Sequence, residues 1–281
     1  MAGDGIHDLV LAAERAGTPF SVAGAWGTAH GVVCRSAPAR RRGAAVASPV
    51  NVLLAPPWPG LEDADAARRL DDAVTVGLMR AGAAVLRVRA LDLAPDAGAE
   101  GYVDAVADLA TAPGDAPARA MAGSWLAGTA VALASGRLPG LAFLVLASAP
   151  AAEVMTRRTP EDEDDPRWER SPTLRLADAL AAQSPLEAVT VHPRPVLLVN
   201  GAVDTVLPAA HLESWRAALD ATQQRVEAVE VAFADAFMRA VSERGALEAD
   251  AGWDPAVIAA EAIERWTRDA FTSAAQARRG R

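Results

Sequence analysis

The chain has 281 residues, of which 51% are hydrophobic and 22% charged, an ordinary globular balance for one large α/β domain. Its net charge of −9 and its pI near 5.0 disfavour nucleic acids and anionic membranes as partners, because both attract basic surfaces. The sequence has no lysine, which excludes Schiff-base catalysis, and its single cysteine, Cys34, excludes an internal disulfide and a thiolate metal cluster.

The beginning of the chain lacks the apolar core of a secretion signal, because its first twenty residues include Asp4, Asp8, Glu14 and Arg15. No uninterrupted apolar run reaches the roughly 18 residues that a membrane-spanning helix needs. The sequence therefore predicts a cytoplasmic protein without a membrane partner.

The predicted elements begin with a short N-terminal unit. Apolar residues recur at helical spacing within 1–18, which predicts an amphipathic helix. Two β-like stretches follow at 20–26 and 28–35. The segment 37–48 is rich in Ala, Arg, Ser and Pro, which is typical of an exposed loop.

From residue 50 onward, short apolar runs alternate with longer segments of helical periodicity. The runs predict strands at 50–55, 84–88, 118–123, 141–147, 195–199 and 226–231. The periodic segments predict helices at 62–81, 100–110, 126–135, 173–182, 208–220 and 254–272. This alternation predicts the α/β class, with a mainly parallel, doubly wound sheet and helices on both of its faces.

One segment, from about 151 to 190, interrupts the alternation. It contains five consecutive acidic residues at 161–165 between two prolines, which is typical of a solvated loop. Alternatively, the segment is a lid, because long insertions on α/β scaffolds often cover a pocket. We find no internal repeat and no domain boundary, so 1–281 is predicted to be a single domain with a lid or cap insertion.

Three local patterns that follow predicted strands suggest a family. They are Ala-Pro-Pro-Trp-Pro-Gly at 55–60, Gly-Ser-Trp-Leu-Ala-Gly-Thr-Ala at 123–130 and Gly-Ala-Val-Asp-Thr-Val-Leu-Pro at 201–208. From about residue 50 to 272 the chain resembles the α/β-hydrolase superfamily, nearest to its dienelactone-hydrolase-like members. The resemblance implies the α/β-hydrolase fold, and it implies that Asp204 is the acid of a catalytic triad.

The register of the second pattern decides which residue stands at the nucleophile position. A nucleophile elbow is a sharp strand-to-helix turn that needs small residues two positions before and two positions after the nucleophile. With Ser124 as the nucleophile, Leu126 breaks this requirement. With Trp125 in that position, Gly123 and Ala127 satisfy it. The second register fits better, and it places an indole, which cannot attack a carbonyl, where the nucleophile belongs.

Two further departures weaken the expectation of hydrolysis. The histidines are His7, His30, His192 and His211, so none follows the last predicted strand, where the family has its catalytic histidine. The resemblance places Asp235 there instead, and His192 and His211 are expected to be surface or core-edge residues. Pro56-Pro57 stands where the family has the His-Gly pair of an oxyanion-hole loop, and proline has no N–H to donate. Alternatively, these prolines form a rigid turn that packs Trp58 against the sheet.

The candidate site therefore has an unusual composition. Asp204, Asp235 and Ser124 are the candidate catalytic residues, and Trp125, Trp58, Leu126 and Pro57 are the candidate ligand-binding residues. If the two aspartates converge at the carboxyl edge of the sheet, the pKa of one carboxyl group is raised. The pair can then transfer protons. Alternatively, Asp235 is solvated on a loop and Asp204 only caps a turn.

The predicted function is that of an α/β-hydrolase-fold protein without a complete Ser-His-Asp triad. It is expected to bind a small acyl or peptidic ligand, and either only to bind it or to catalyse a non-hydrolytic biosynthetic step, namely epimerisation, isomerisation or cyclisation. The alternatives are a serine esterase that uses Ser124 and a non-catalytic binding module with a homodimer interface. No phosphate-binding glycine motif and no metal-ligand spacing is present, so neither a cofactor nor a metal is expected.

Overall fold

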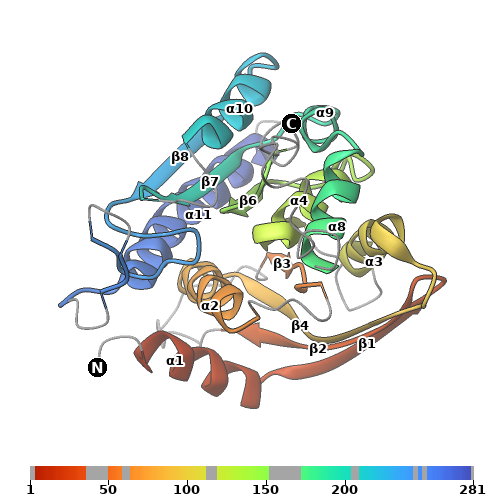
Figure 1. Cartoon of the computed structure of the whole chain (residues 1–281), viewed down its shortest axis with the longest axis horizontal. Coiled ribbons are helices and arrows are strands. Elements are labelled where there is room, and N and C mark those ends of the chain that lie inside the picture. Colours follow the sequence, from red (N-terminus) through yellow and green to blue (C-terminus); the bar gives the residue numbers. More distant parts are fainter. Residues whose placement is uncertain are drawn as a thin grey trace, which may run out of the picture.

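Eight strands form one sheet in the order β1-β2-β4-β3-β5-β6-β7-β8 (Figure 1). In this computed structural model the described residues are 4–35, 50–58, 64–111, 119–151, 172–203, 209–242, 246–248 and 252–279. The strands are β1 (Thr18–Gly24), β2 (Gly27–Arg35), β3 (Asn51–Leu54), β4 (Ala84–Leu93), β5 (Ala120–Ser124), β6 (Leu144–Ala147), β7 (Val196–Gly201) and β8 (Val226–Val231). All pairings from β4 to β8 are parallel, whereas β2 runs antiparallel to both of its neighbours.

Helices cover both faces of the sheet (Figure 1). One face carries α1 (Asp4–Arg15), α2 (Ala64–Arg80) and α11 (Pro255–Arg279). The other face carries α3 (Gly98–Thr111), α4 (Trp125–Ser135), α8 (Pro172–Ala181), α9 (Pro185–Thr190) and α10 (Ala209–Asp220). Successive strand residues point to opposite faces, so Leu53 packs with the second group of helices, while Val52 and Leu54 pack with the first. The predicted mainly parallel, doubly wound sheet is confirmed.

The boundaries of some elements differ from those predicted. Strand β4 continues to Leu93 because its second half pairs with the antiparallel β2, an extension that an apolar run does not reveal. Strand β6 begins only at Leu144. Helix α9 was not predicted, since its six residues are too few to show a helical period.

Part of the predicted insertion at 151–190 packs into the helical layer. Leu176 and Leu180 of α8 and Val189 of α9 are buried in the same cluster as Leu126 and Leu133 of α4. Residues 152–171, with the acidic run, lie outside the described residues, so the lid stays a prediction. Within the described ranges, none of the helices combines the length and the apolar character that crossing a membrane requires.

Candidate functional site

The junction of β5 and α4 holds Trp125 in a left-handed backbone conformation. Ser124 ends the strand with an extended backbone (φ −110°, ψ 149°), and Trp125 follows with φ 50°. For a bulky residue this conformation costs about 1–3 kcal/mol, so the surrounding structure must enforce it. A sharp strand-to-helix turn with a strained residue at its tip is the geometry of a nucleophile elbow.

Two glycines allow the strand and the helix to approach each other around Trp125. A Cβ atom added to Gly123 would lie 2.6 Å from the carbonyl oxygen of Ala127. A Cβ atom added to Gly128 would lie 2.5 Å from the Cβ of Ala149, a residue of the chain that follows β6. Real Cβ atoms do not come so close to other atoms, so the tight turn requires glycine at both positions.

The side chains of Ser124 and Trp125 lie in different environments. Ser124 is buried and its hydroxyl donates a hydrogen bond to the carboxylate of Asp71 on α2. The half-buried Trp125 packs against the core on the α4 side, and its ring centroid lies 5.4 Å from that of Phe237. Leu126 is buried in that same core.

The loop after β8 lies beside this turn, and it carries Asp235. The Asp235 carboxylate accepts hydrogen bonds of 2.9 Å from the backbone N–H groups of Phe237 and Arg239, and one of 2.5 Å from Nε of Arg239. Asp235 is only 8% exposed, so the alternative expectation of a solvated aspartate is wrong. Asp204 lies outside the described residues, and the convergence of the two carboxylates stays a prediction.

The loop after β3 is fixed by an aromatic contact and a hydrogen bond. The ring of Trp58 meets the ring of Tyr102 edge-on, with centroids 5.3 Å apart. The Tyr102 hydroxyl donates a hydrogen bond to the carbonyl oxygen of Pro56, and the next residue, Pro57, is exposed. Trp58 therefore packs over α3.

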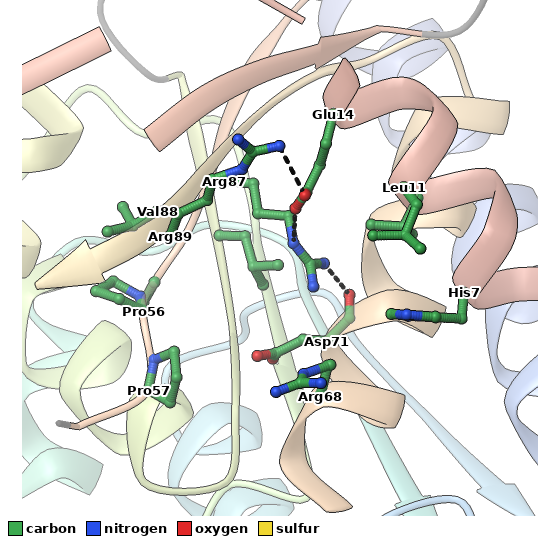
Figure 2. A pocket seen from close by; sticks show the side chains of 13 residues that line it. His7, Leu11, Glu14, Pro56, Pro57, Arg68, Asp71, Arg87, Val88 and Arg89 are labelled. Atoms are coloured by element: carbon green, nitrogen blue, oxygen red, sulfur yellow. Dashed lines mark hydrogen bonds and ion pairs between the residues drawn. The ribbon is translucent and has the colours of Figure 1, made fainter. Parts of the chain in front are cut away.

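A cavity of about 380 Å³ lies under helix α1, and Pro57 is the predicted site residue that lines it. Its charged residues come from three elements that are distant in the sequence: α1, α2 and β4 (Figure 2). They are His7, Glu14, Arg68, Asp71, Arg87 and Arg89. None of these charged residues was predicted from the sequence to belong to a site.

An arginine organises the ion pairs around the cavity. Arg87 contacts Oδ1 of Asp72 through Nη2 at 2.5 Å and Oε1 of Glu14 through Nε at 2.9 Å. Arg89 reaches the other Glu14 oxygen at 2.9 Å, and His7 Nδ1 lies 2.7 Å from Oδ2 of Asp72. These contacts tie α1 to α2 and to β4, so they fix one wall of the cavity.

Asp71 stands out among these residues because it titrates near neutral pH. Burial raises the pKa of its carboxyl to about 6, although Arg87 and the Ser124 hydroxyl act in the opposite direction. Perturbed carboxyl groups at cavity walls are candidates for function. In the sequence, Asp71 and Asp72 stand among Leu70, Ala73 and Val74 of a helical segment, a setting that alone does not show that the two carboxylates are buried.

The four histidines provide no base in the position expected of a triad. His211 is fully buried in α10, which contradicts its expected place at the core edge. Its Nδ1 accepts a hydrogen bond of 2.7 Å from the backbone N–H of Ala151, and burial lowers its pKa to about 4. His211 is therefore a neutral core residue. Among the described residues, no group of three or more His, Cys, Asp or Glu side chains could hold a metal ion.

The strain at Trp125 can be measured by comparing two substitutions. Trp125→Gly is expected to be more stable than Trp125→Ala by about 1 kcal/mol, because both lose the indole and only glycine accepts φ 50° without cost. Urea denaturation measures the difference. At the next position, Leu126, the backbone is helical, so Leu126→Ala should exceed Leu126→Gly in stability by about 1 kcal/mol. If the glycine and alanine variants had the same order of stability at both positions, the backbone of Trp125 would not be strained.

Comparisons with known proteins support the architecture. No protein-family model matches the sequence, and no curated protein matches it either. Among solved structures, Est1E from Butyrivibrio proteoclasticus is similar at 15% identity, with 90% of this chain and 99% of that chain covered and a TM-score of 0.63. The esterase domain of a Rhodothermus marinus protein is similar at 16% identity, with 90% and 98% covered and a TM-score of 0.56. A putative α/β hydrolase from Agrobacterium tumefaciens is similar at 14% identity, with 90% and 96% covered and a TM-score of 0.51. With the strand order and the helices on both faces, these likenesses show that the chain has the α/β-hydrolase fold.

Proposed function

We propose that this protein is a non-hydrolytic protein of the α/β-hydrolase fold that binds a small acyl or peptidic ligand. The observation that carries the proposal is Trp125 at the tip of the strained turn between β5 and α4. Hydrolases of this fold carry their nucleophile at the tip of such a turn. An indole has no nucleophilic atom that could form an acyl intermediate.

The neighbours of Trp125 support the proposal. The hydroxyl of Ser124 is engaged by a buried carboxylate on the α2 side. In the loop after β8, Asp235 takes the place in which the family resemblance expects a histidine, and it pairs with Arg239. Nucleophile, base and acid act as a unit, so the loss of two of them removes triad catalysis. The chemistry that carboxyl groups still allow is proton transfer, as in epimerisation, isomerisation or cyclisation.

A fluorophosphonate probe tests the absence of hydrolysis. We expect no covalent labelling of the wild-type protein, because Ser124 is buried and its hydroxyl donates to a carboxylate of α2 and not to a histidine. An active serine esterase, labelled in parallel, controls for the probe. Stoichiometric labelling of the wild type that disappears in Ser124→Ala would establish the serine esterase instead.

A pair of cysteine substitutions tests the register of the turn. Trp125→Cys is expected to react with iodoacetamide at least about tenfold faster than Ser124→Cys, because Trp125 is half-buried and Ser124 is only 3% exposed. The native Cys34 adds little background, since it is buried and burial raises the pKa of its thiol to about 11. Faster reaction at position 124 would show that Ser124, not Trp125, stands at the accessible tip of the turn.

A further inference from the structure

The cavity under α1 combines apolar and charged surface. Its volume of about 380 Å³ lies in the range of small-molecule sites. Apolar lining comes from the end of β3, from β4 and from α1, and it includes Val10, Leu11, Leu54, Ala55, Pro56 and Val88. A ligand that fills this space needs an apolar body and a polar group.

Two polar side chains on α2 define where that polar group would bind. Arg68 and Asp71 are three residues apart, so they lie on the same side of the helix. Figure 2 shows both side chains pointing from α2 toward the loop that carries Pro57. The guanidinium of Arg68 is a donor, and the Asp71 carboxyl is also a donor when it is protonated.

We propose that this cavity binds a small carboxylate with an apolar body, and that Arg68 and the protonated Asp71 hold its carboxylate group. The inference rests on the proposed ligand-binding function, and it gives that ligand a place and a chemical class. Guanidinium groups match the planar geometry of a carboxylate, and a neutral carboxyl group donates its O–H to an anion without repelling it.

The surroundings of Asp71 favour its protonated form when such a ligand is bound. Burial already raises its pKa to about 6. Within the described part of the chain, the charged or titratable groups around it are His7 and Glu14 on α1, Arg68 and Asp72 on α2, Arg87 and Arg89 on β4, and Tyr102 on α3, while Ser124 on β5 donates the hydrogen bond. A bound carboxylate adds negative charge and raises the pKa further. Binding therefore takes up a proton and weakens as the pH rises.

The size of this pH effect follows from the population of the binding-competent form. At pH 8 only about 1% of the protein has a neutral Asp71 if its pKa is about 6, whereas at pH 5.5 most of it does. The apparent affinity falls in proportion to that fraction. We therefore expect a loss of affinity of about tenfold or more between pH 5.5 and pH 8.

Titration calorimetry of the full chain with hexanoate tests the proposal, with hexanamide as the uncharged control. Hexanoate is expected to bind at pH 5.5 and to bind about tenfold or more weakly at pH 8, and hexanamide more weakly than hexanoate at pH 5.5. Asp71→Asn should bind equally at both pH values, whereas His7→Gln should keep the pH dependence. Arg68→Gln should bind about tenfold more weakly.

A matched control separates the role of Arg68 from a general change in charge. Arg68 is exposed, and Arg137→Gln removes another exposed charge, whose partner is Asp104 on α3. The proposal is overturned if hexanoate does not bind, if Arg68→Gln and Arg137→Gln bind it equally, or if the pH dependence survives in Asp71→Asn. Fluorophosphonate labelling of a protein that binds hexanoate as expected would overturn the proposed function alone. Absence of both labelling and binding would overturn this inference alone.

Discussion

Replacing Arg87 with methionine is expected to lower the free energy of unfolding by about 3–5 kcal/mol, because the change removes the buried arginine that two buried carboxylates share. The Arg87 side chain is 13% exposed, and those of Asp72 and Glu14, which it joins, are 3% and 11% exposed. Arg87 also donates a hydrogen bond of 2.7 Å to the hydroxyl of Thr75. Removal of one member of such a group costs far more than the formation of the pair contributes.

The neighbouring arginine provides the control for this prediction. Arg89 binds the same carboxylate, Glu14, but its side chain is 47% exposed, so Arg89→Met should cost less than about 1 kcal/mol. Urea denaturation at neutral pH measures both variants, and comparable m-values show that the denatured states are alike. Equal losses for the two substitutions would mean that burial does not determine the strength of this network.

The fold could be predicted because its signals are local. Most of the parallel strands are short apolar runs, such as Val52–Leu54, and most of the longer helices show their own period, so the order of these elements follows from the sequence. The turn at Trp125 could be predicted for the same reason, since the steric requirement involves only residues within a few positions of it.

The charged network could not be predicted because its contacts join distant parts of the chain. His7 and Asp72 are 65 residues apart, and Ser124 and Asp71 are 53 residues apart. Asp71 and Asp72 lie in the middle of α2, and the helical period alone does not show that their side chains are buried. Only the packing of α1 over α2 and β4 shows that Asp71 and Asp72 are buried, and only this packing forms the cavity.

The orientation of Ser124 illustrates the same limit. Its residue type and its place beside the turn suggested a nucleophile, and the local pattern left both registers open. A partner on another element, Asp71, engages the hydroxyl on the α2 side of the sheet. The environment of the Ser124 hydroxyl therefore depends on a contact with a residue distant in the sequence. The position of the turn depends only on residues close to it in the sequence.

The stability of Asp71→Asn relative to that of the wild type is expected to rise by about 2–3 kcal/mol between pH 4 and pH 8. The folded protein holds the Asp71 proton with a pKa of about 6, against the ordinary aspartate value of 3.8, so the folded state binds more protons than the unfolded state in this interval. Stability from this group is complete below pH 3.8 and is lost as the pH rises through about 6. The shift corresponds to about 3 kcal/mol, and an uncharged asparagine does not lose it.

The difference between variant and wild type isolates this effect, because the titration of all other carboxylates cancels in it. Urea denaturation at several pH values from 4 to 8 gives that difference directly. Asparagine still offers an oxygen to the Ser124 hydroxyl, so the hydrogen bond is kept while the charge is removed. Asp72→Asn provides the opposite case, since Asp72 is paired with Arg87 and His7 and its loss should destabilise the protein at pH 8. A difference for Asp71→Asn that stays constant with pH would mean that Asp71 is ionised throughout, which would remove the neutral donor on which carboxylate binding under α1 depends.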